Sequence, residues 1–172
     1  MCRVLLISVL LSGCSLSGDT ATEPSDLSLR VDQSSYVAVS QRTEPPLTYT
    51  FNLVAQFENS SERTVYLARC YPDSPNPIYG LELVGQEDEW GAAYNRAYAC
   101  VGHENPIAVG PGETRTDTLM IAGPNSFADG PRGVLEGQFR LFYQAQSCRA
   151  EVGCDIPFLP GSSAEFEVQL AL

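Results

Sequence analysis

The chain has 172 residues, a net charge of −11, an isoelectric point near 4.4 and 44% hydrophobic residues. This composition excludes a disordered chain or a coiled coil, and the length fits one domain with a sizeable core. All ten basic residues are arginines. Because so acidic a field repels phosphate backbones and anionic headgroups, the composition argues against nucleic-acid binding and against electrostatic adhesion to a membrane.

Residues 1–13 are predicted to be a signal peptide. Arg3 supplies a positive charge, and the apolar run from Val4 to Leu11 follows it, before the small residues Ser12 and Gly13. A charged start, a short apolar stretch and a small-residue exit are typical of secretory leaders. The run is far shorter than the roughly 20 apolar residues that span a bilayer.

Cys14 is predicted to be the lipid-anchored first residue of the mature chain. The tetrapeptide 11–14, Leu-Ser-Gly-Cys, resembles the bacterial lipobox, which implies acylation of the Cys14 thiol (palmitate-type chains) and cleavage just before it. Stable anchoring takes more than one acyl chain, and a diacyl or triacyl cysteine provides them. The alternative is an ordinary secretory leader in which the cysteine is incidental.

Residues 14–26 are predicted to be the lipidated cysteine and a flexible tether, because Ser, Thr, Gly, Pro and acids dominate this stretch. A tether of this length typically reaches roughly 20 Å, which keeps the domain close to its membrane. Ser15 follows the cysteine where the familiar inner-membrane retention signal is Asp. In a two-membrane bacterium this resembles the outer-membrane default.

Residues 27–172 are predicted to form one all-β domain, because short alternating apolar runs are separated by Gly, Pro, Asn and Ser. The clearest alternation runs from Tyr49 to Phe57, and Asn59-Ser60-Ser61 is predicted to form the turn that follows it. An immunoglobulin-like antiparallel β-sandwich of seven to nine strands fits this pattern best. Ten candidate segments supply these seven to nine strands: 27–31, 36–39, 49–57, 65–69, 78–84, 90–100, a segment beginning at Ile107, 114–121, 139–143 and 166–170.

Five short pieces also follow one another in a fixed order between about residues 27 and 145. They are Asp32 to Tyr36, Phe57-Glu58-Asn59, Leu81 to Trp90, Pro111-Gly112-Glu113-Thr114 and Gly137-Gln138-Phe139-Arg140. This order resembles the bacterial immunoglobulin-like domains of envelope lipoproteins, and intracellular proteinase-inhibitor-like domains share a similar strand order. Phe139 departs from the tyrosine usual there, so no phenolic hydroxyl ties that corner. The resemblance implies a fold and an envelope address, and no chemistry.

Four of the six cysteines are predicted to form two disulfides. Cys2 leaves with the leader and Cys14 carries lipid, and the even remainder in an exported domain suggests bridges. The sequence-local pairing is favoured over the two other connectivities, and a four-cysteine metal site is disfavoured because no CxxC pair or nearby His occurs. The favoured bridges are Cys70–Cys100 and Cys148–Cys154.

No catalytic residue, metal ligand or cofactor is predicted. His103 is the only histidine, and without a GxSxG motif a loop position is the simpler interpretation. The acids 87–89 are interpreted as a solvated hairpin tip, because they lack the spaced oxygens of a calcium loop and adjacent acids rarely form a glycosidase pair.

The segment 71–79 is the predicted contact surface. Its three prolines restrict the backbone, and Tyr71 and Tyr79 offer rigid amphipathic side chains, which Tyr94 and Tyr98 could extend. A loop merely packed over the end of the fold is the alternative. The sequence therefore favours a membrane-anchored, extracytoplasmic, non-enzymatic module that binds a protein or glycan or supports the envelope. The second possibility is an extracytoplasmic protease inhibitor presenting a rigid loop.

Overall fold

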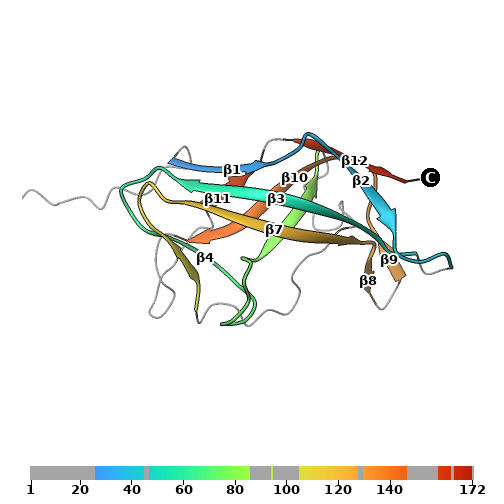
Figure 1. Cartoon of the computed structure of the whole chain (residues 1–172), viewed down its shortest axis with the longest axis horizontal. Helices are drawn as coiled ribbons and strands as arrows, with labels where there is room; N and C mark the ends of the chain where they lie inside the picture. The colour runs from blue at the N-terminus through green and yellow to red at the C-terminus, as the bar shows by residue number, and fades with distance from the viewer. Residues whose placement is uncertain are drawn as a thin grey trace, which may run out of the picture.

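The computed structural model describes residues 26–44, 47–85, 94, 105–127, 130–146, 159–163 and 165–171. The predicted all-β fold is confirmed (Figure 1). Within these ranges no helix is long and apolar enough to cross a membrane. The strands are β1 (Leu27–Val31), β2 (Ser35–Ser40), β3 (Tyr49–Asn59), β4 (Val65–Leu67), β5 (Tyr79–Leu83), β6 (Ile107–Val109), β7 (Thr114–Gly123), β8 (Asn125–Phe127), β9 (Gly130–Arg132), β10 (Gly137–Gln146), β11 (Leu159–Ser162) and β12 (Phe166–Leu170).

Nine of these segments coincide with strands predicted from the alternation of apolar residues: β1 to β7, β10 and β12. The remaining three, β8, β9 and β11, are three or four residues long and carry Pro, Gly or Asn instead of an alternating pattern. Such segments pair because the fold brings them beside a partner, so the local sequence does not indicate them. The predicted strand at 90–100 lies outside the described residues, apart from Tyr94.

One half of the fold is built on β3, the longest strand. It pairs antiparallel with β7 along ten residues and with β1 along its second half. Side chains at alternate positions of β3, from Phe51 to Phe57, are buried, as the period of a half-buried strand requires. The prediction of this strand is therefore correct in both position and inward face.

The other half is built on β10. Phe139 pairs with β5 on one side and with β12 on the other, and the far end of β10 pairs with β4 and β11. β6 continues the sheet beyond β4. In Figure 1, β10 and β5 cross behind β3 and β7, so the inner faces of the two halves enclose the core.

β2 joins the two halves into one curled sheet of ten strands, and β8 and β9 form a separate two-stranded sheet. Residues 35–38 pair parallel with β12, whereas Val39 and Ser40 pair antiparallel with β3. The parallel pair departs from the predicted all-antiparallel order. It arises because the chain passes from β1 to the opposite half without reversing its direction.

The crossing from β1 to β2 is fixed by Asp32. Its carboxylate Oδ1 accepts hydrogen bonds from the Tyr36 hydroxyl (2.7 Å) and the Val54 N–H (2.9 Å). Burial alone would raise the pKa of this carboxyl, but the hydrogen bonds outweigh it and hold the pKa below its ordinary value of 3.8. The side chain thus replaces a backbone acceptor where β1 leaves β3.

Aromatic rings connect the two halves of the core. The Tyr36 ring lies 5.3 Å from the rings of both Phe51 and Phe166, and Phe57 stacks on Tyr143 at 6.1 Å. These pairs join β3 to β12 and β10. Burial of large rings of this kind dominates the stabilisation of a small β core.

Tyr94 belongs to this core and does not extend an exposed patch, so that part of the prediction is wrong. Its side chain is fully buried, with its ring edge-on to Phe51 and Phe139, and its hydroxyl donates to the Leu135 carbonyl at 2.5 Å. A tyrosine in a stretch without clear alternation gives no sequence signal of which face it occupies. Tyr94 supplies the ring that fills the space beside Phe139.

Asn59, predicted in a turn, is the fully buried last residue of β3. Its side-chain oxygen accepts from the N–H and hydroxyl of Ser61. Its side-chain nitrogen donates to the carbonyls of Arg63 (2.7 Å), Val109 (2.9 Å) and Gly110 (3.1 Å). The amide therefore ties β3, the 60–63 turn and the end of β6 together.

Candidate functional site

The segment 71–79 lies along the free edge of β7. Among the described strands β7 pairs only with β3, so its other edge has no strand beside it. Exposed edges of this length are usually protected, because they offer unpaired backbone groups to other chains. Here the protection comes from a loop.

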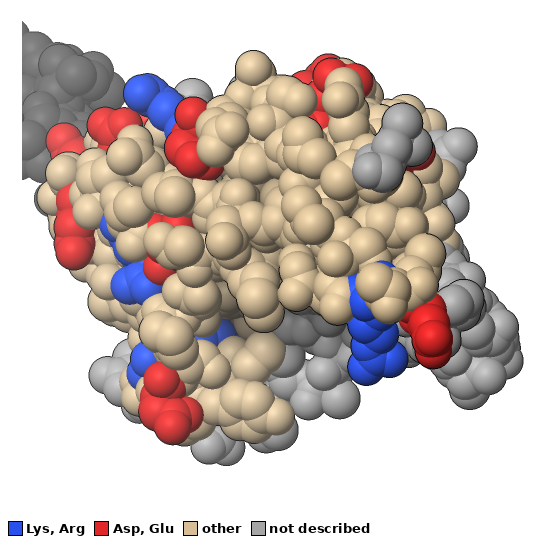
Figure 2. All heavy atoms as spheres, turned by 45° about the vertical axis from the view of Figure 1, so that its right-hand side comes forward, with Lys and Arg blue, Asp and Glu red and all other residues tan. Residues whose placement is uncertain are grey.

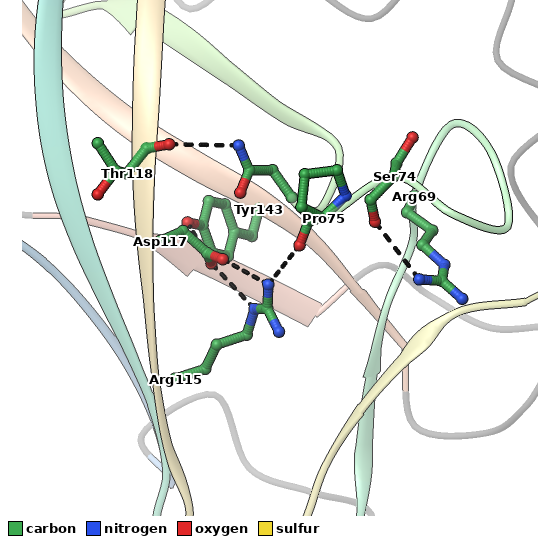
Figure 3. A network of polar contacts seen from close by, with 8 residues as sticks. Arg69, Ser74, Pro75, Arg115, Asp117, Thr118 and Tyr143 are labelled. Carbon is green, nitrogen blue, oxygen red and sulfur yellow. Dashed lines mark hydrogen bonds and ion pairs between the residues drawn. The ribbon is translucent and has the colours of Figure 1, made fainter.

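Three hydrogen bonds attach the segment to β7, and Figure 3 shows the two that end on the carbonyls of Pro75 and Thr118. The Arg115 guanidinium donates to the Pro75 carbonyl at 2.5 Å, and the Asn76 amide donates to the Thr118 carbonyl at 3.3 Å. The Tyr79 hydroxyl donates to the Met120 carbonyl at 3.2 Å. Two outward-facing carbonyls of the edge strand are thereby satisfied by side chains of the segment.

The segment is also closed upon itself. The Ser74 N–H donates to the Tyr71 carbonyl (3.0 Å), and the Tyr71 N–H donates to the Ser74 hydroxyl (3.2 Å). The Arg69 guanidinium donates to the Ser74 carbonyl at 3.4 Å, and the Ile78 N–H donates to the Ala68 carbonyl at 2.6 Å. With three prolines restricting the backbone, both ends and the middle of the segment are fixed.

The attachment rests on a charged pair that points into the core. Asp117 is 3% exposed and accepts two hydrogen bonds from the Arg115 guanidinium, at 2.5 and 3.1 Å, and one from the Tyr143 hydroxyl at 3.0 Å. Burial and the nearby Asp117 charge raise the pKa of Tyr143, so its hydroxyl stays protonated and keeps donating at neutral pH. The carboxylate holds Arg115 in the position from which it reaches Pro75.

The structure places the two predicted contact residues differently. The Tyr71 side chain is 60% exposed, whereas Tyr79 is half-buried and packs against the core. Tyr71 is therefore available to a partner, and Tyr79 acts mainly in holding the segment on β7. Whether either binds a partner stays a prediction.

The other predicted site residues lie mostly outside the described residues. Cys70 is described, half-buried just before the segment and disulfide-bonded. The cysteine that pairs with it lies beyond the described ranges, so the pairing stays a prediction. The residues that cannot be placed are Cys14, Cys100, Cys148, Cys154, His103 and the acids 87–89.

The described residues contain no group of three His, Cys, Asp or Glu side chains that could hold a metal ion. The polar groups that are assembled beside the segment are an arginine, an aspartate and a tyrosine, all engaged with one another. Such a closed network fixes a loop, and it presents no nucleophile or general base to a substrate.

Arg115 and Asp117 were not among the residues predicted from the sequence. Both occupy the same alternating face of β7 as the buried Leu119 and Ile121. Opposite charges two residues apart on a face that is otherwise apolar would have predicted an inward-pointing ion pair, a known device of edge strands.

No family model and no curated protein matches the chain. The solved structures to which the chain is similar include the following three, each with a TM-score below 0.5. A structural genomics target, SoR45, has a TM-score of 0.44 and 10% identity over 84% of this chain and 87% of its own. The DNA glycosylase AlkC of Pseudomonas fluorescens has a TM-score of 0.37 and 11% sequence identity, over 87% of this chain and 31% of its own. A PapD-like domain of human CEP192 has a TM-score of 0.30 and 16% sequence identity, over 98% of this chain and 96% of its own.

Proposed function

We propose that the chain is a membrane-anchored, extracytoplasmic lipoprotein whose domain acts as a non-enzymatic binding module of the cell envelope. The observation that carries the binding role is Tyr71, a largely exposed aromatic side chain on a segment fixed to β7 by hydrogen bonds. A rigid aromatic anchor loses little entropy on binding, which is why tyrosine is frequent among the residues that dominate interfaces. The partner is a protein or a glycan.

The proposed anchor rests on the sequence of the leader. The lipobox-like tetrapeptide 11–14 places an acylated Cys14 about a dozen residues before the domain. Disulfides Cys70–Cys100 and Cys148–Cys154 fit the same exported setting, and the bonded state of Cys70 fits a bridge at that cysteine without selecting its partner. The resemblance to bacterial immunoglobulin-like envelope lipoproteins points to the same address, the outer membrane where the source has two membranes.

An extracytoplasmic protease inhibitor is the second candidate. The feature that favours it is the same segment, because an inhibitory loop must stay rigid while it lies in a protease groove. The two candidates differ in what the isolated protein does. An inhibitor slows a protease at stoichiometric concentration, whereas a binding module leaves a panel of envelope proteases unaffected.

The anchor is tested by detergent partition and mass spectrometry of the native chain and of Cys14→Ala. The native chain should enter the detergent phase with an acylated N-terminal cysteine, and the variant should stay unprocessed or soluble. A native chain that is soluble, with an unmodified N-terminus elsewhere, would contradict the proposed anchor.

The binding role is tested by photo-crosslinking in the native envelope. A crosslinking amino acid at position 71 should capture one defined partner, and the same amino acid at the exposed control position 134 should not. Tyr71→Ala should then weaken that partner's binding by about 2 kcal/mol, the scale of an aromatic anchor residue. Equal capture at both positions would remove the segment as the contact surface.

A further inference from the structure

A second surface lies where β2 separates from β3. A groove of about 730 Å³ opens there, a size in the range of ligand sites. It is lined by three of the five large hydrophobic side chains that are exposed in the described structure: Val37 (54%), Val39 (51%) and Met120 (64%). The polar groups around it are amides and hydroxyls, including those of Gln41, Thr50 and Asn52.

The two walls of the groove carry backbone groups that face each other without pairing. The Gln41 N–H donates to the Thr48 carbonyl, and Val39 is the partner of Thr50, so the next pair in this register would be Val37 with Asn52. The described ladder stops before that pair. It stops because residues 35–38 of β2 turn to β12.

The orientation of these backbone groups follows from the neighbouring hydrogen bonds. The N–H and carbonyl of Val54 bond to Asp32, and alternate residues of a strand face the same side, so those of Asn52 face the groove. On the other wall, the carbonyls of Ser34 and Ala38 accept hydrogen bonds from the β12 side. The N–H and carbonyl of Val37 therefore face away from β12, toward the groove.

The chemistry of the groove is neutral in an acidic molecule. None of the nine described residues lining it is charged, although the chain carries a net charge of −11. The outward side chains of β7 that continue this face are three threonines, Met120 and Ala122, all of them uncharged. Figure 2 shows a broad area without charged side chains, with acidic and basic side chains at its margins. A charged ligand would lose its hydration here without an ionic partner among the lining residues. The neighbouring Asp32 carboxylate already accepts hydrogen bonds from Gln33, Tyr36 and Val54.

We propose that this groove binds an extended, uncharged peptide segment of a partner protein. The peptide places branched aliphatic side chains against Val37, Val39 and Met120, and its backbone pairs with the open N–H and carbonyl groups of Val37 and Asn52. Main-chain hydrogen bonds hold extended peptides at strand edges. Here the opening is one pair of positions, because β3 is already bonded to Asp32 at Val54 and paired with Val39 at Thr50. The proposal does not depend on the role of the segment 71–79.

The test selects seven-residue peptides from a phage-displayed library on the whole chain and measures their binding by calorimetry. Enriched peptides should lack acidic and basic residues and carry aliphatic residues at alternate positions. Val37→Glu should weaken binding at least about tenfold, because it buries a carboxylate without a partner. Val134→Glu, at an exposed valine outside the groove, should leave binding within about twofold.

Backbone pairing has its own readout. N-methylation of alternate residues in an enriched peptide should abolish binding in one register and leave it in the other, since only alternate N–H groups face the groove. Thermal melts of both valine variants check that they are folded. The proposal is overturned by a lack of enrichment, by selection of charged peptides, by equal loss in the two variants, or by binding of envelope glycans or a second copy at the groove instead.

Discussion

Two aspartate–tyrosine pairs hold different parts of this molecule, and their contrast separates local from long-range structure. Asp32 and Tyr36 lie four residues apart, with the carboxylate at the surface and a hydroxyl–carboxylate distance of 2.7 Å. Asp117 and Tyr143 lie 26 residues apart, and the carboxylate is buried beside Arg115 at 3.0 Å from the hydroxyl. The first pair sets the path of the chain between two strands. The second fixes the predicted contact segment to the edge of the sheet.

The difference in burial determines how much stability is lost when each pair is broken. A surface carboxylate that loses its partner returns to water at little cost, whereas a buried one leaves charged and polar groups unsatisfied. The buried pair must therefore be the more sensitive to mutation. Its loss must also reach the segment 71–79, because Arg115 bonds to both Asp117 and Pro75.

The largest effect is expected for Asp117→Ala, with a loss of about 3 kcal/mol in the free energy of unfolding. The variant leaves the Tyr143 hydroxyl and the Arg115 guanidinium without their acceptor. Urea denaturation measures the loss. Asp73→Ala, at an exposed aspartate on the segment itself, is the control and should stay within about 0.5 kcal/mol of the native chain.

Replacing the whole ion pair sharpens this result. The double variant Arg115→Met with Asp117→Leu should regain most of the lost stability, since apolar side chains of similar size replace the buried charges. It should not restore the hydrogen bond to Pro75, so the Ser74 and Ile78 amides, which are hydrogen-bonded in the native chain, should exchange faster than in the native chain. A double variant with native exchange at these amides would show that Arg115 does not hold the segment.

Tyr79→Ala is expected to cost about 2 kcal/mol, because a half-buried ring that packs against the core is removed. Tyr71→Ala is the matched comparison, a tyrosine of the same segment that is 60% exposed, and should cost no more than about 0.5 kcal/mol. Thermal melts of the two variants decide this. Equal and large losses would make both residues structural and would remove the contact surface.

Tyr143→Phe tests the buried hydrogen bond alone. It should cost about 1.5 kcal/mol, because the ring that stacks on Phe57 is kept while a charge-assisted bond is lost. Tyr66→Phe, at a half-buried tyrosine on β4, controls for loss of a hydroxyl in general. A loss no larger than that of the control would place the stabilisation by Asp117 entirely in its pairing with Arg115.

The same contrast explains how much the sequence could predict. Alternation identified β3 and the inward face of Phe51 to Phe57, because a strand's own side chains carry that signal. The spacing of Asp32 and Tyr36 also lay within reach of a local pattern. The pairing of Asp117 with Tyr143 did not, since it depends on β7 and β10 facing each other across the core.

Two further features depended on the tertiary fold in the same way. Tyr94 was assigned to the contact surface because its predicted strand leads to Cys100, which a disulfide would hold near the segment 71–79, yet its ring fills the core. Asn59 looked like a turn residue because asparagine favours turns, yet it ends β3 and bonds to carbonyls about 50 residues away. In both cases the side chain contacts residues that are distant in the sequence, and local propensity carries no information about such contacts.

The smallest effect is expected for Tyr36→Phe, about 1 kcal/mol or less near neutral pH, because Asp32 stands at the surface. The effect should depend on pH. The Tyr36 hydroxyl and the Val54 N–H hold the pKa of Asp32 below its ordinary value of 3.8, so the ionised carboxylate stabilises the fold at every pH above that value. As the pH falls through the lowered pKa, Asp32 takes up a proton and this contribution is lost. The stability difference between the native chain and Tyr36→Phe should therefore be constant from about pH 7 to 5 and narrow below 3.8, as urea denaturation at a series of pH values would show.

A residual difference from the Gln33 N–H, which donates to the Tyr36 hydroxyl at 3.2 Å, should persist at low pH. If the full difference in unfolding free energy persisted below pH 3.8, the Tyr36 hydroxyl would stabilise the β1–β2 connection without the ionised Asp32. The bond to an ionised carboxylate would then matter only in the buried pair, Asp117 and Tyr143.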